Sequence, residues 1–290
     1  SAAHAAAAAQ NYPTGALYVV ATPIGNLADI SLRALQVLNL CDTVACEDTR
    51  HSQSLLRAYK IDKQNHQWLA VHQHNEAEAS QEVVRRLQAG QRVAYVSDAG
   101  TPAISDPGAR LVQAVRAAGF RVMPLPGASS VTTLLSASGM TGDGFVFTGF
   151  LPSKSAEREQ AVQAIAQESR AVVLLEAPHR MAALAQALSV LGERRVTVGR
   201  ELTKQFEQIE TLAAAALPTW LAEKPEHQRG EFVLVVHDQP VAPSRGEGER
   251  ILKCLLAELP VKTAVKLAAE ISGEARNALY ERALALKNAD

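Results

Sequence analysis

The sequence predicts an α/β protein with two α/β domains followed by a small helical element. Short β-favouring runs alternate with amphipathic stretches of helical length, which is typical of a mostly parallel sheet. The segment P-L-P-G-A-S-S (124–130) interrupts this pattern, and the closer spacing of later strands favours a mixed sheet. We therefore divide the chain into a disordered tail (1–14), an N-terminal α/β domain (15–125), a C-terminal α/β domain (126–239), and a linker with C-terminal helices (240–290).

The N-terminal domain begins with a buried strand, A-L-Y-V-V-A-T, directly after Gly15. The turn T-P-I-G-N-L follows, and Ser31 is placed to cap a helix in which Leu32, Leu35 and Leu38 share one face. The next elements alternate as strand 43–46, helix 52–59, strand 68–71, helix 76–89, strand 92–96 and, after one more helix, strand 121–124.

The most informative stretch is the loop after strand 92–96, which reads S-D-A-G-T-P-A-I-S-D-P-G. Its glycine at Gly100 and its small neighbours allow backbone groups to approach a ligand closely. Asp106 and Pro107 are typical of the N-cap and first residue of a helix, here one that ends at Gly119. Ligands bind at the carboxyl ends of strands in open α/β sheets, so we predict a ligand loop here; the alternative is a well-capped strand-to-helix connection.

The C-terminal domain is predicted from shorter, more closely spaced elements. They are helix 130–137, strand 144–148, helix 155–167, strand 171–175, helix 181–191, strand 195–200, a pairing segment 206–211, helix 217–223 and strand 231–237. From 239 to 248 the chain is rich in Pro, Gly and Glu, which indicates a linker. Two amphipathic helices broken at Ser272 and Gly273 then resemble a small helix-turn-helix pair with nearly balanced charge.

Composition limits the class of protein. The 290 residues are 47% hydrophobic, enough for a sizeable core, and 29 basic against 30 acidic residues provide no overall attraction to nucleic acid. A local basic face stays compatible with that balance. Cys41, Cys46 and Cys254 lack the number and spacing of a disulfide framework or zinc cluster, so we expect reduced thiols in a cytoplasmic protein. No apolar run is long enough for a transmembrane helix, and the alanine-rich start does not resemble a signal peptide.

Several familiar ligand motifs are missing from the sequence. It contains no G-x-G-x-x-G after the first strand, no P-loop and no G-x-S-x-G elbow, which disfavours dinucleotide, P-loop and serine-hydrolase chemistry. His72 and His74 form H-x-H, but no third ligand accompanies them at a metal-site spacing. We therefore expect no metal site and interpret the two histidines as polar residues at a strand end.

Seven short segments, in order, carry a resemblance to a known family. They are T-P-I-G-N-L-A-D-I-S (22–31), A-C-E-D-T-R (45–50), V-S-D-A-G-T-P-A-I-S-D-P-G (96–108), P-G-A-S-S (126–130), T-G-F-L-P (148–152), E-A-P-H-R (176–180) and G-R-E-L-T-K (199–204). Together they resemble the tetrapyrrole methylase superfamily and, within it, the ribosomal RNA small subunit methyltransferase I branch. The resemblance runs from about residue 15 to the C-terminus, with departures in the alanine-rich start and the last helices.

The resemblance implies a methyltransferase that uses S-adenosylmethionine to modify the ribose 2′-oxygen of a cytidine in the decoding region of 16S rRNA. It further implies a homodimer, action on rRNA within the small ribosomal subunit, and a cofactor cleft between the two α/β domains. Carried onto this chain, the cofactor-binding residues are Ser97, Asp98, Gly100, Thr101, Ile104, Ser105, Gly127, Ser129, Ser130, Glu176, Pro178 and Gly230. Among them, Asp98 has a turn-stabilising role as its alternative, and the two serines have helix capping.

The sequence gives less information about the residues that would contact the methyl acceptor. A ribose hydroxyl is a poor nucleophile near neutral pH, so a positioned base helps, although alignment alone can suffice. The candidates for a base are Glu47, Asp48, His179, Glu201 and Glu231, each with a structural role as the alternative. The candidates for RNA phosphate contacts are Arg50, Arg180, Arg200 and Lys204, with surface ion pairs as the alternative.

Two other functions stay open at this point. One is methylation of a tetrapyrrole by the same fold, against which the C-E-D-T-R and G-R-E-L-T-K segments and the extra C-terminal helices argue. The other is a non-catalytic module that binds S-adenosylmethionine or RNA. Turnover with a methyl acceptor distinguishes an enzyme from such a module.

Overall fold

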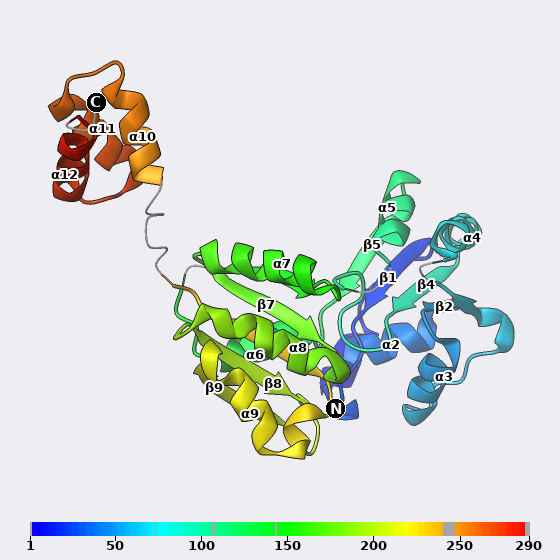
Figure 1. The fold of residues 1–290 in the computed structure, drawn as a ribbon. Helices are drawn as coiled ribbons and strands as arrows, with labels where there is room; N and C mark the ends of the chain where they lie inside the picture. Colours follow the sequence, from blue (N-terminus) through cyan, green and yellow to red (C-terminus); the bar gives the residue numbers. More distant parts are fainter. Residues whose placement is uncertain (1, 73, 106–107, 143, 240–246, 288–290) are drawn as a thin grey trace.

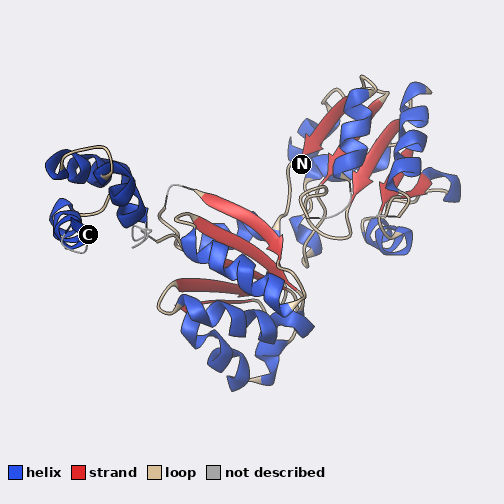
Figure 2. Cartoon of the chain, turned by 45° about the horizontal axis from the view of Figure 1, so that its top comes forward, coloured by secondary structure: helices blue, strands red, loops and turns tan. Residues whose placement is uncertain are grey.

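The computed structural model describes residues 2–72, 74–105, 108–142, 144–239 and 247–287. Two five-stranded sheets follow one another along the chain, and three helices form a separate group at the C-terminal end (Figure 1). Figure 2 shows helices on both faces of the sheets. The prediction of two α/β units and a C-terminal helical element is confirmed.

The first sheet has the strand order β3-β2-β4-β1-β5, and every neighbouring pair is parallel. Its elements are β1 (Ala16–Val20), α2 (Leu32–Leu40), β2 (Thr43–Cys46), α3 (Thr49–Ala58), β3 (Trp68–Ala70), α4 (Glu76–Gln88), β4 (Arg92–Val96), α5 (Ala109–Ala117) and β5 (Arg121–Leu125). Helices of the crossovers lie on both faces, which is the doubly wound arrangement.

Alternation of side chains builds the two cores of this sheet. In β1, Ala16, Tyr18 and Val20 pack into the core under α2 and α3, whereas Leu17 packs into the core under α4 and α5. Each strand therefore places apolar side chains on both faces, as expected for a buried parallel sheet. The helices leave β1 and β4 toward opposite faces, so the carboxyl ends of these adjacent strands form the switch point of the sheet.

The second sheet has the order β6-β7-β10-β8-β9 and is mixed, because only β6 and β7 are parallel. Its elements are α6 (Ser130–Ala137), β6 (Phe145–Phe150), α7 (Ser155–Gln167), β7 (Ala171–Glu176), α8 (Pro178–Leu188), β8 (Arg195–Arg200), β9 (Gln208–Ala213), α9 (Leu217–Glu223) and β10 (Phe232–Val236). Short 3-10 turns lie at Leu27–Asp29, Asn65–Gln67, Ser189–Leu191, Ala214–Ala216 and Pro225–Gln228.

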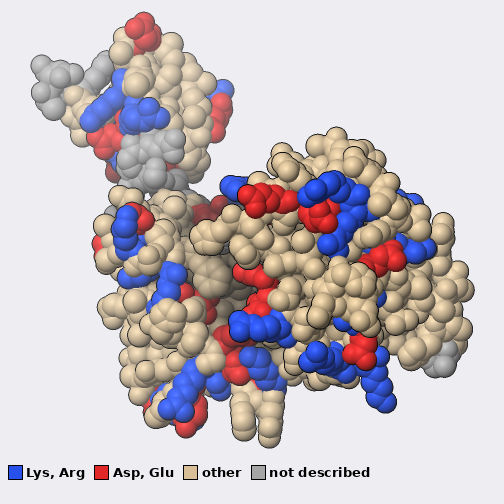
Figure 3. Space-filling view, turned by 90° about the vertical axis from the view of Figure 1, so that its right-hand side faces the viewer, with Lys and Arg blue, Asp and Glu red and all other residues tan. Residues whose placement is uncertain are grey.

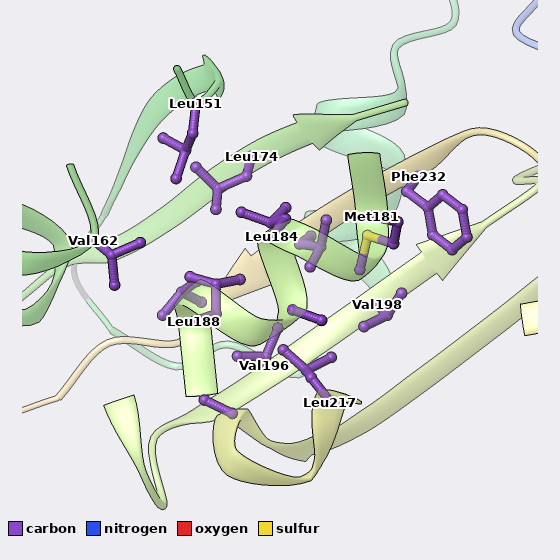
Figure 4. Close-up of a cluster of buried hydrophobic side chains, with 14 of the residues drawn as sticks. Leu151, Val162, Leu174, Met181, Leu184, Leu188, Val196, Val198, Leu217 and Phe232 are labelled. Atoms are coloured by element: carbon purple, nitrogen blue, oxygen red, sulfur yellow. The ribbon is translucent and has the colours of Figure 1, made fainter. Parts of the chain in front are cut away.

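The larger core of the second sheet lies under α7, α8 and α9. Leu174, Met181, Leu184 and Val198 point toward one another there, from a strand, a helix and a second strand (Figure 4). The opposite face is covered by α6, whose Leu134 is completely buried. The Ile24 side chain, from the first half of the chain, also packs against this second face.

The C-terminal helices are α10 (Glu247–Leu256), α11 (Val261–Ser272) and α12 (Arg276–Lys287), and they share a small core of their own. Glu274 joins them, since its carboxylate accepts hydrogen bonds from the Gly248 N–H at 3.1 Å and from Arg282 at 2.6 Å. The predicted break between the last two helices is confirmed, with Gly273 at φ +71°. Helix α10 was not predicted, and it begins inside the predicted linker; residues 240–246 of that linker lie outside the described residues.

The prediction of a disordered tail is wrong for the first residues. Helix α1 (Ala2–Ala8) forms there, and the Tyr12 hydroxyl donates to the Ala7 carbonyl at 2.7 Å. Tyr12 is buried in the core of the first sheet, which anchors this segment. Alanine has the highest intrinsic helix propensity, so the run that resembled a tail is also a good helix former.

Helix details also differ from the predictions. The buried face of α2 consists of Ala34, Val37 and Leu38 rather than three leucines, although Ser31 caps the helix as predicted. Helix α8 begins at Pro178 and ends at Leu188, with a 3-10 turn after it, and α3 begins three residues before its predicted start. Strand β6 continues past a bulge to Phe150, two residues beyond its predicted end, because its last residues still pair with β7.

The start of α5 is capped from elsewhere in the chain. Asp106 and Pro107, the predicted cap, lie outside the described residues. The buried carboxylate of Glu76, on α4, accepts hydrogen bonds from the Gly108 N–H at 3.0 Å and from the Arg110 N–H at 3.2 Å. A carboxylate at a helix N-terminus satisfies open N–H groups and interacts favourably with the helix dipole.

Candidate functional site

The site lies where the loops after β1 and β4 meet. Thr22 and Gly100 exchange two backbone hydrogen bonds, at 2.9 and 3.0 Å, and the Thr22 hydroxyl donates to the Ser97 carbonyl at 3.2 Å. These contacts join the two loops across the switch point of the first sheet. The loop after β4 is therefore held in place at its base, and its outer side faces the second sheet.

Backbone conformation shapes this loop. Gly100 has φ +78°, and a β-carbon there would lie 3.3 Å from the Ile24 side chain. Ala103 also has a positive φ, of 65°. The Thr101 hydroxyl donates to the Ala128 carbonyl at 3.0 Å and so connects the loop to the P-G-A-S-S segment. Glycine at residue 100 is thus required both by its torsion angle and by a close neighbour.

The loop and the second sheet enclose a cavity of about 400 Å³, which is within the range of small-molecule sites. One side, which we call the loop wall, consists of Ile24, Ala99, Gly100, Thr101, Ile104, Ser105, Ser129, Ser130 and Val131. The other side, the sheet wall, consists of Phe147, Phe150, Leu175, Glu176, Ala177, Pro178, Leu202, Glu231, Phe232 and Val233. The sheet wall comes from the ends of β6 and β7, the starts of α8 and β10, and the loop after β8.

Glu176 is a buried carboxylate in the sheet wall, with a side chain only 1% exposed. Its Oε1 accepts a hydrogen bond from the Ala177 N–H at 2.9 Å and lies 3.2 Å from Arg180 Nε. Arg180 also donates to the Leu151 carbonyl, which fixes the guanidinium. Within the described part of the chain, the second oxygen, Oε2, has no hydrogen-bond partner.

A second charged group lies at Glu231. Lys204 Nζ lies 3.1 Å from Glu231 Oε2 and 2.9 Å from Glu201 Oε1, and that oxygen also accepts from the Glu231 N–H at 2.9 Å. The Lys204 side chain lies against Gly25, where a β-carbon would be 2.5 Å from its Cγ. One lysine thus connects two carboxylates of the second domain to the loop after β1.

Protonation states in this network follow from its contacts. Burial acts to raise the pKa of Glu201, but hydrogen bonds from Lys204 and the Glu231 N–H outweigh it, and the pKa lies below its ordinary value. Burial acts to lower the pKa of Lys204, but the carboxylates of Glu201 and Glu231 outweigh it, and the pKa is raised. Both groups are therefore charged at neutral pH.

Eight of the twelve predicted cofactor-binding residues line the cavity. They are Gly100, Thr101, Ile104, Ser105, Ser129, Ser130, Glu176 and Pro178. The other four are not among the lining residues. The Ser97 hydroxyl donates within its own loop, Asp98 accepts from the Asp48 N–H at 3.4 Å, Gly127 packs on Ala21, and Gly230 has φ +91° next to Glu201.

The five predicted candidates for a base differ in their hydrogen-bond partners and in whether they line the cavity. Glu231 is the one that lines the cavity, and 75% of its side chain is exposed. Glu201 is held by Lys204, and Asp48 caps α3 through the Arg50 and His51 N–H groups, which lowers the pKa of Asp48. His179 is exposed in the first turn of α8, and Glu47 is half-buried beside Asp48; neither lines the cavity.

The four residues predicted to contact RNA phosphates differ in their exposure and in their partners within the protein. The side chain of Arg50 is 91% exposed, 3.6 Å from Asp48. Arg200 is buried and donates to the Arg229 and Phe206 carbonyls. The Arg200 guanidinium is therefore occupied inside the protein. The Arg180 side chain is 25% exposed, lies 3.2 Å from Glu176 and donates to the Leu151 carbonyl. On the face seen in Figure 3, basic and acidic side chains are interspersed rather than separated into fields of one sign.

Sequence reasoning missed the apolar residues that complete the cavity. Ile24, Phe147, Phe150 and Leu202 come from three separate segments, since Phe147 and Phe150 both lie on β6, and Phe150 is 52% exposed. The segments T-P-I-G-N-L, T-G-F-L-P and G-R-E-L-T-K contain three of these residues, so the motif positions were the available signal. Which side chain in each segment faces the cavity depends on the fold.

Two remaining features of the described residues concern metal binding and membranes. No group of three or more His, Cys, Asp or Glu side chains there is arranged to hold a metal ion. His72 and His74 contact each other edge to face, with ring centroids 6.2 Å apart. No helix in the described ranges combines the length and apolar character needed to span a membrane.

Comparison with solved structures supports the fold. Cobalt precorrin-4 methyltransferase matches with a TM-score of 0.56 at 17% identity, over 78% of this chain and 98% of that one. Uroporphyrin-III C-methyltransferase from Thermus thermophilus matches with a TM-score of 0.53 at 20% identity, over 76% and 94% of the two chains. At this identity the likeness concerns the fold alone.

Sequence comparisons are more specific. Residues 16–218 match the family of tetrapyrrole (corrin/porphyrin) methylases, and residues 242–287 match the RsmI C-terminal HTH domain. The ribosomal RNA small subunit methyltransferase I of Pseudomonas aeruginosa is 48% identical over 276 residues, 93% of this chain and 97% of its own length. The protein of that name from Escherichia coli O157:H7 is 46% identical over 93% and 95% of the two chains. The chain therefore belongs to the tetrapyrrole methylase family, in its ribosomal RNA small subunit methyltransferase I branch.

Proposed function

We propose that this protein is an S-adenosylmethionine-dependent methyltransferase that acts on the RNA of the small ribosomal subunit. The observation that carries the proposal is the cavity, since eight of the residues that the resemblance assigns to the cofactor lie on its two walls. Relatives that are 44–48% identical over more than nine-tenths of this chain are named ribosomal RNA small subunit methyltransferase I. A tetrapyrrole methylase from Thermus thermophilus of similar fold, TM-score 0.51, has been solved with S-adenosylhomocysteine.

The residues present fit such a cofactor. The Gly100 region brings backbone groups to the cavity without side-chain bulk, and the apolar residues of both walls suit an adenine ring. Glu176 offers a buried hydrogen-bond acceptor, because its Oε2 has no hydrogen-bond partner among the described residues. When bound, S-adenosylmethionine supplies an activated methyl group, so the protein contributes alignment and exclusion of water.

We assign the acceptor side to the region around Glu231. Its exposed carboxylate lies at the cavity and is oriented by Lys204, so it is the described candidate best placed to take the proton of an incoming hydroxyl. The proposed acceptor is the ribose 2′-oxygen of a cytidine in the decoding region of 16S rRNA, as the resemblance implies. The proposal includes a homodimer that acts in the cytoplasm on the small subunit.

Transfer of labelled methyl from S-adenosylmethionine tests the proposal. The acceptors are assembled small subunits, naked 16S rRNA and a uroporphyrinogen-type tetrapyrrole. Labelled RNA is then digested with alkali, because a 2′-O-methyl group blocks cleavage at the following phosphate. We expect label in an alkali-resistant dinucleotide; label in the tetrapyrrole alone would contradict the substrate, and label in an alkali-sensitive nucleotide would contradict the position.

Two further measurements test the partners. Sedimentation is expected to give twice the 31.0 kDa chain mass, and a monomer at micromolar concentration would contradict the homodimer. Arg50→Ala is expected to weaken binding to small-subunit RNA and to reduce the salt dependence of binding by about one counterion. Arg57→Ala, on the same helix, is the control, and an equal loss in both variants would remove the role of Arg50.

A further inference from the structure

Phe206 lies in the loop between β8 and β9, and its surface is 71% exposed. No other large hydrophobic residue in the described ranges exposes a higher fraction of its surface. The residues on either side of it, from Lys204 to Gln208, are polar or charged, so the neighbouring chain adds no apolar surface. Leu202, in the same loop, lines the cavity. A single exposed aromatic ring is therefore carried by a loop that also forms part of the sheet wall.

The loop that carries Phe206 is held in a strained conformation. Glu201 has φ +51° and Thr203 has φ +67°, and neither is a glycine. The Thr203 N–H donates to the Glu207 carboxylate. The buried Arg200 guanidinium donates to the Phe206 carbonyl at 3.2 Å. Such torsions persist where contacts over-determine the backbone, and they are concentrated at functional sites. The ring is thus presented in a fixed position.

Phe206 lies beside the cavity, at the same edge of the second sheet. One row of paired residues crosses that edge from the sheet wall to the loop: Glu176 on β7, Phe232 on β10, Arg200 on β8 and Gln208 on β9. Neighbouring strands are about 4.8 Å apart, so Gln208 lies about 10 Å from Phe232. Phe206 itself is not among the lining residues. A group that meets the ring therefore belongs to a part of the substrate next to the reacting one.

The size of this contact favours a nucleobase over a protein surface. A stable contact between two protein molecules buries about 800 Å² on each partner, which one ring among polar neighbours does not provide. An unpaired base needs only a flat apolar face, and bases of single-stranded RNA stack on aromatic side chains in this way. The acceptor in the proposed function is RNA, so bases flank the nucleotide that enters the cavity.

We propose that Phe206 stacks on an RNA base adjacent to the nucleotide whose ribose enters the cavity. The inference rests on the proposed function and adds a requirement on the substrate, namely that the RNA is unpaired at this neighbouring base. Stacking of this kind strengthens binding before and during methyl transfer alike, so it lowers KM and leaves kcat nearly unchanged. Phe206 lies outside the cavity lining, so cofactor affinity should not depend on the ring.

Steady-state kinetics of methyl transfer test the proposal, with assembled small subunits and naked 16S rRNA as acceptors and S-adenosylmethionine at saturation. For Phe206→Ala we expect KM for the RNA acceptor to rise about 10-fold and kcat to change less than about threefold. Phe206→Trp keeps a flat aromatic face and should retain the wild-type KM. Phe206→Leu keeps the apolar character without the flat face, so its KM should rise as in the alanine variant.

The matched control is Phe145→Ala. Phe145 is another exposed phenylalanine of the second sheet, at 43%, and is not among the residues that line the cavity. Its variant should keep the wild-type KM. Calorimetric titration with S-adenosylhomocysteine should give the same affinity for every variant. The melting temperature of Phe206→Ala should stay within about 3 °C of the wild type, because an exposed ring contributes little to the core.

A wild-type KM in Phe206→Ala would overturn the inference. A wild-type KM in Phe206→Leu would also overturn it, by assigning the ring to a general apolar contact. A rise in KM for assembled subunits with unchanged filter binding of naked 16S rRNA would assign the ring to a ribosomal protein instead. Sedimentation of Phe206→Ala as a monomer, where the wild type is a dimer, would assign it to the contact between two copies. Failure of the wild type to methylate either RNA acceptor would contradict the proposed function itself.

Discussion

The two walls of the cavity are built by different means. The loop wall takes its form from backbone torsions and from the pairing of Thr22 with Gly100, and its described lining residues carry no charge. The sheet wall takes its form from regular strand ends and carries both carboxylates of the cavity, Glu176 and Glu231. One wall therefore supplies shape and the other supplies the charged groups, so we expect substitutions in the two walls to affect ligand binding and methyl transfer differently.

The largest effect is expected from Gly100→Val, which breaks the loop wall. A branched side chain at φ +78° is strained, and its β-carbon would lie 3.3 Å from Ile24. We expect the affinity for S-adenosylhomocysteine, measured by calorimetry, to fall at least about 100-fold, or about 2.7 kcal/mol.

The matched control is Gly90→Val. Gly90 has nearly the same torsion, φ +79°, but no atom lies within 4 Å of a β-carbon there. It should lose stability through strain, by about 1–3 kcal/mol, and keep its affinity. Equal loss of affinity in both variants would show that shape at the loop wall is not the cause.

The next effect is expected from Lys204→Met, which leaves the sheet wall in place but removes the cation between Glu201 and Glu231. We expect kcat for methyl transfer to fall about 10-fold, because the Glu231 carboxylate loses its orientation, with little change in cofactor affinity. Lys154→Met removes an exposed ion pair with Glu157 and is the control. Loss of affinity without loss of kcat would contradict the assignment of chemistry to this wall.

Acid unfolding provides a second measurement for the same variant. The pKa of Glu201 lies below its ordinary 4.5 in the folded protein, so its contribution to stability is present above pH 4.5 and is lost as the pH falls. Lys204→Met removes this contribution. The difference in unfolding free energy between wild type and variant should therefore be largest at neutral pH and shrink in acid, as measured by urea unfolding.

A smaller effect is expected from Thr101→Val, which keeps the shape of the side chain and removes the hydrogen bond to the Ala128 carbonyl. We expect about 1 kcal/mol less stability in urea unfolding, and a few-fold weaker binding of S-adenosylhomocysteine. The control is Ser189→Ala, which removes a hydroxyl donor at the C-terminal end of α8, away from the cavity. We expect this variant to lose stability without a change in binding. Unchanged binding in both variants would show that the loop wall contributes to binding through its backbone and not through the Thr101 side chain.

The smallest effect is expected at His237, in the second sheet but not in the cavity. Burial lowers the pKa of His237 below its ordinary 6.5, with smaller contributions from nearby arginines. The unfolded chain therefore binds a proton more readily, and stability falls as the pH drops below 6.5. His237→Gln should reduce that loss between pH 7 and 5 by up to about 1 kcal/mol, without changing cofactor affinity. An unchanged pH dependence would show that His237 does not titrate in this range.

Local signals predicted the parts of the fold that depend on local chemistry. Ser31 caps its helix through a hydrogen bond from the Ala34 N–H at 3.0 Å, as its residue type indicates. The ligand loop was predicted from Gly100 and its small neighbours, and the structure places it at the cavity. The alternation of strands and helices likewise predicted a parallel first sheet and a mixed second one.

Features that join distant segments could not be predicted in this way. Glu76 caps α5 from 32 residues away, and no local pattern indicates such a partner. In α2 the leucines gave a hydrophobic face, but the packing surface of the sheet selects Ala34, Val37 and Leu38. The sheet wall is assembled from four stretches of chain, so its membership depends on the three-dimensional arrangement.

The two hydrogen bonds between Thr22 and Gly100 occupy, with the chain itself, the place where an open α/β sheet ordinarily receives its ligand. The cavity lies beside this pairing, at the border between the two sheets. Neither half of the chain holds a complete cavity, so separate expression of either half should give a scaffold without activity.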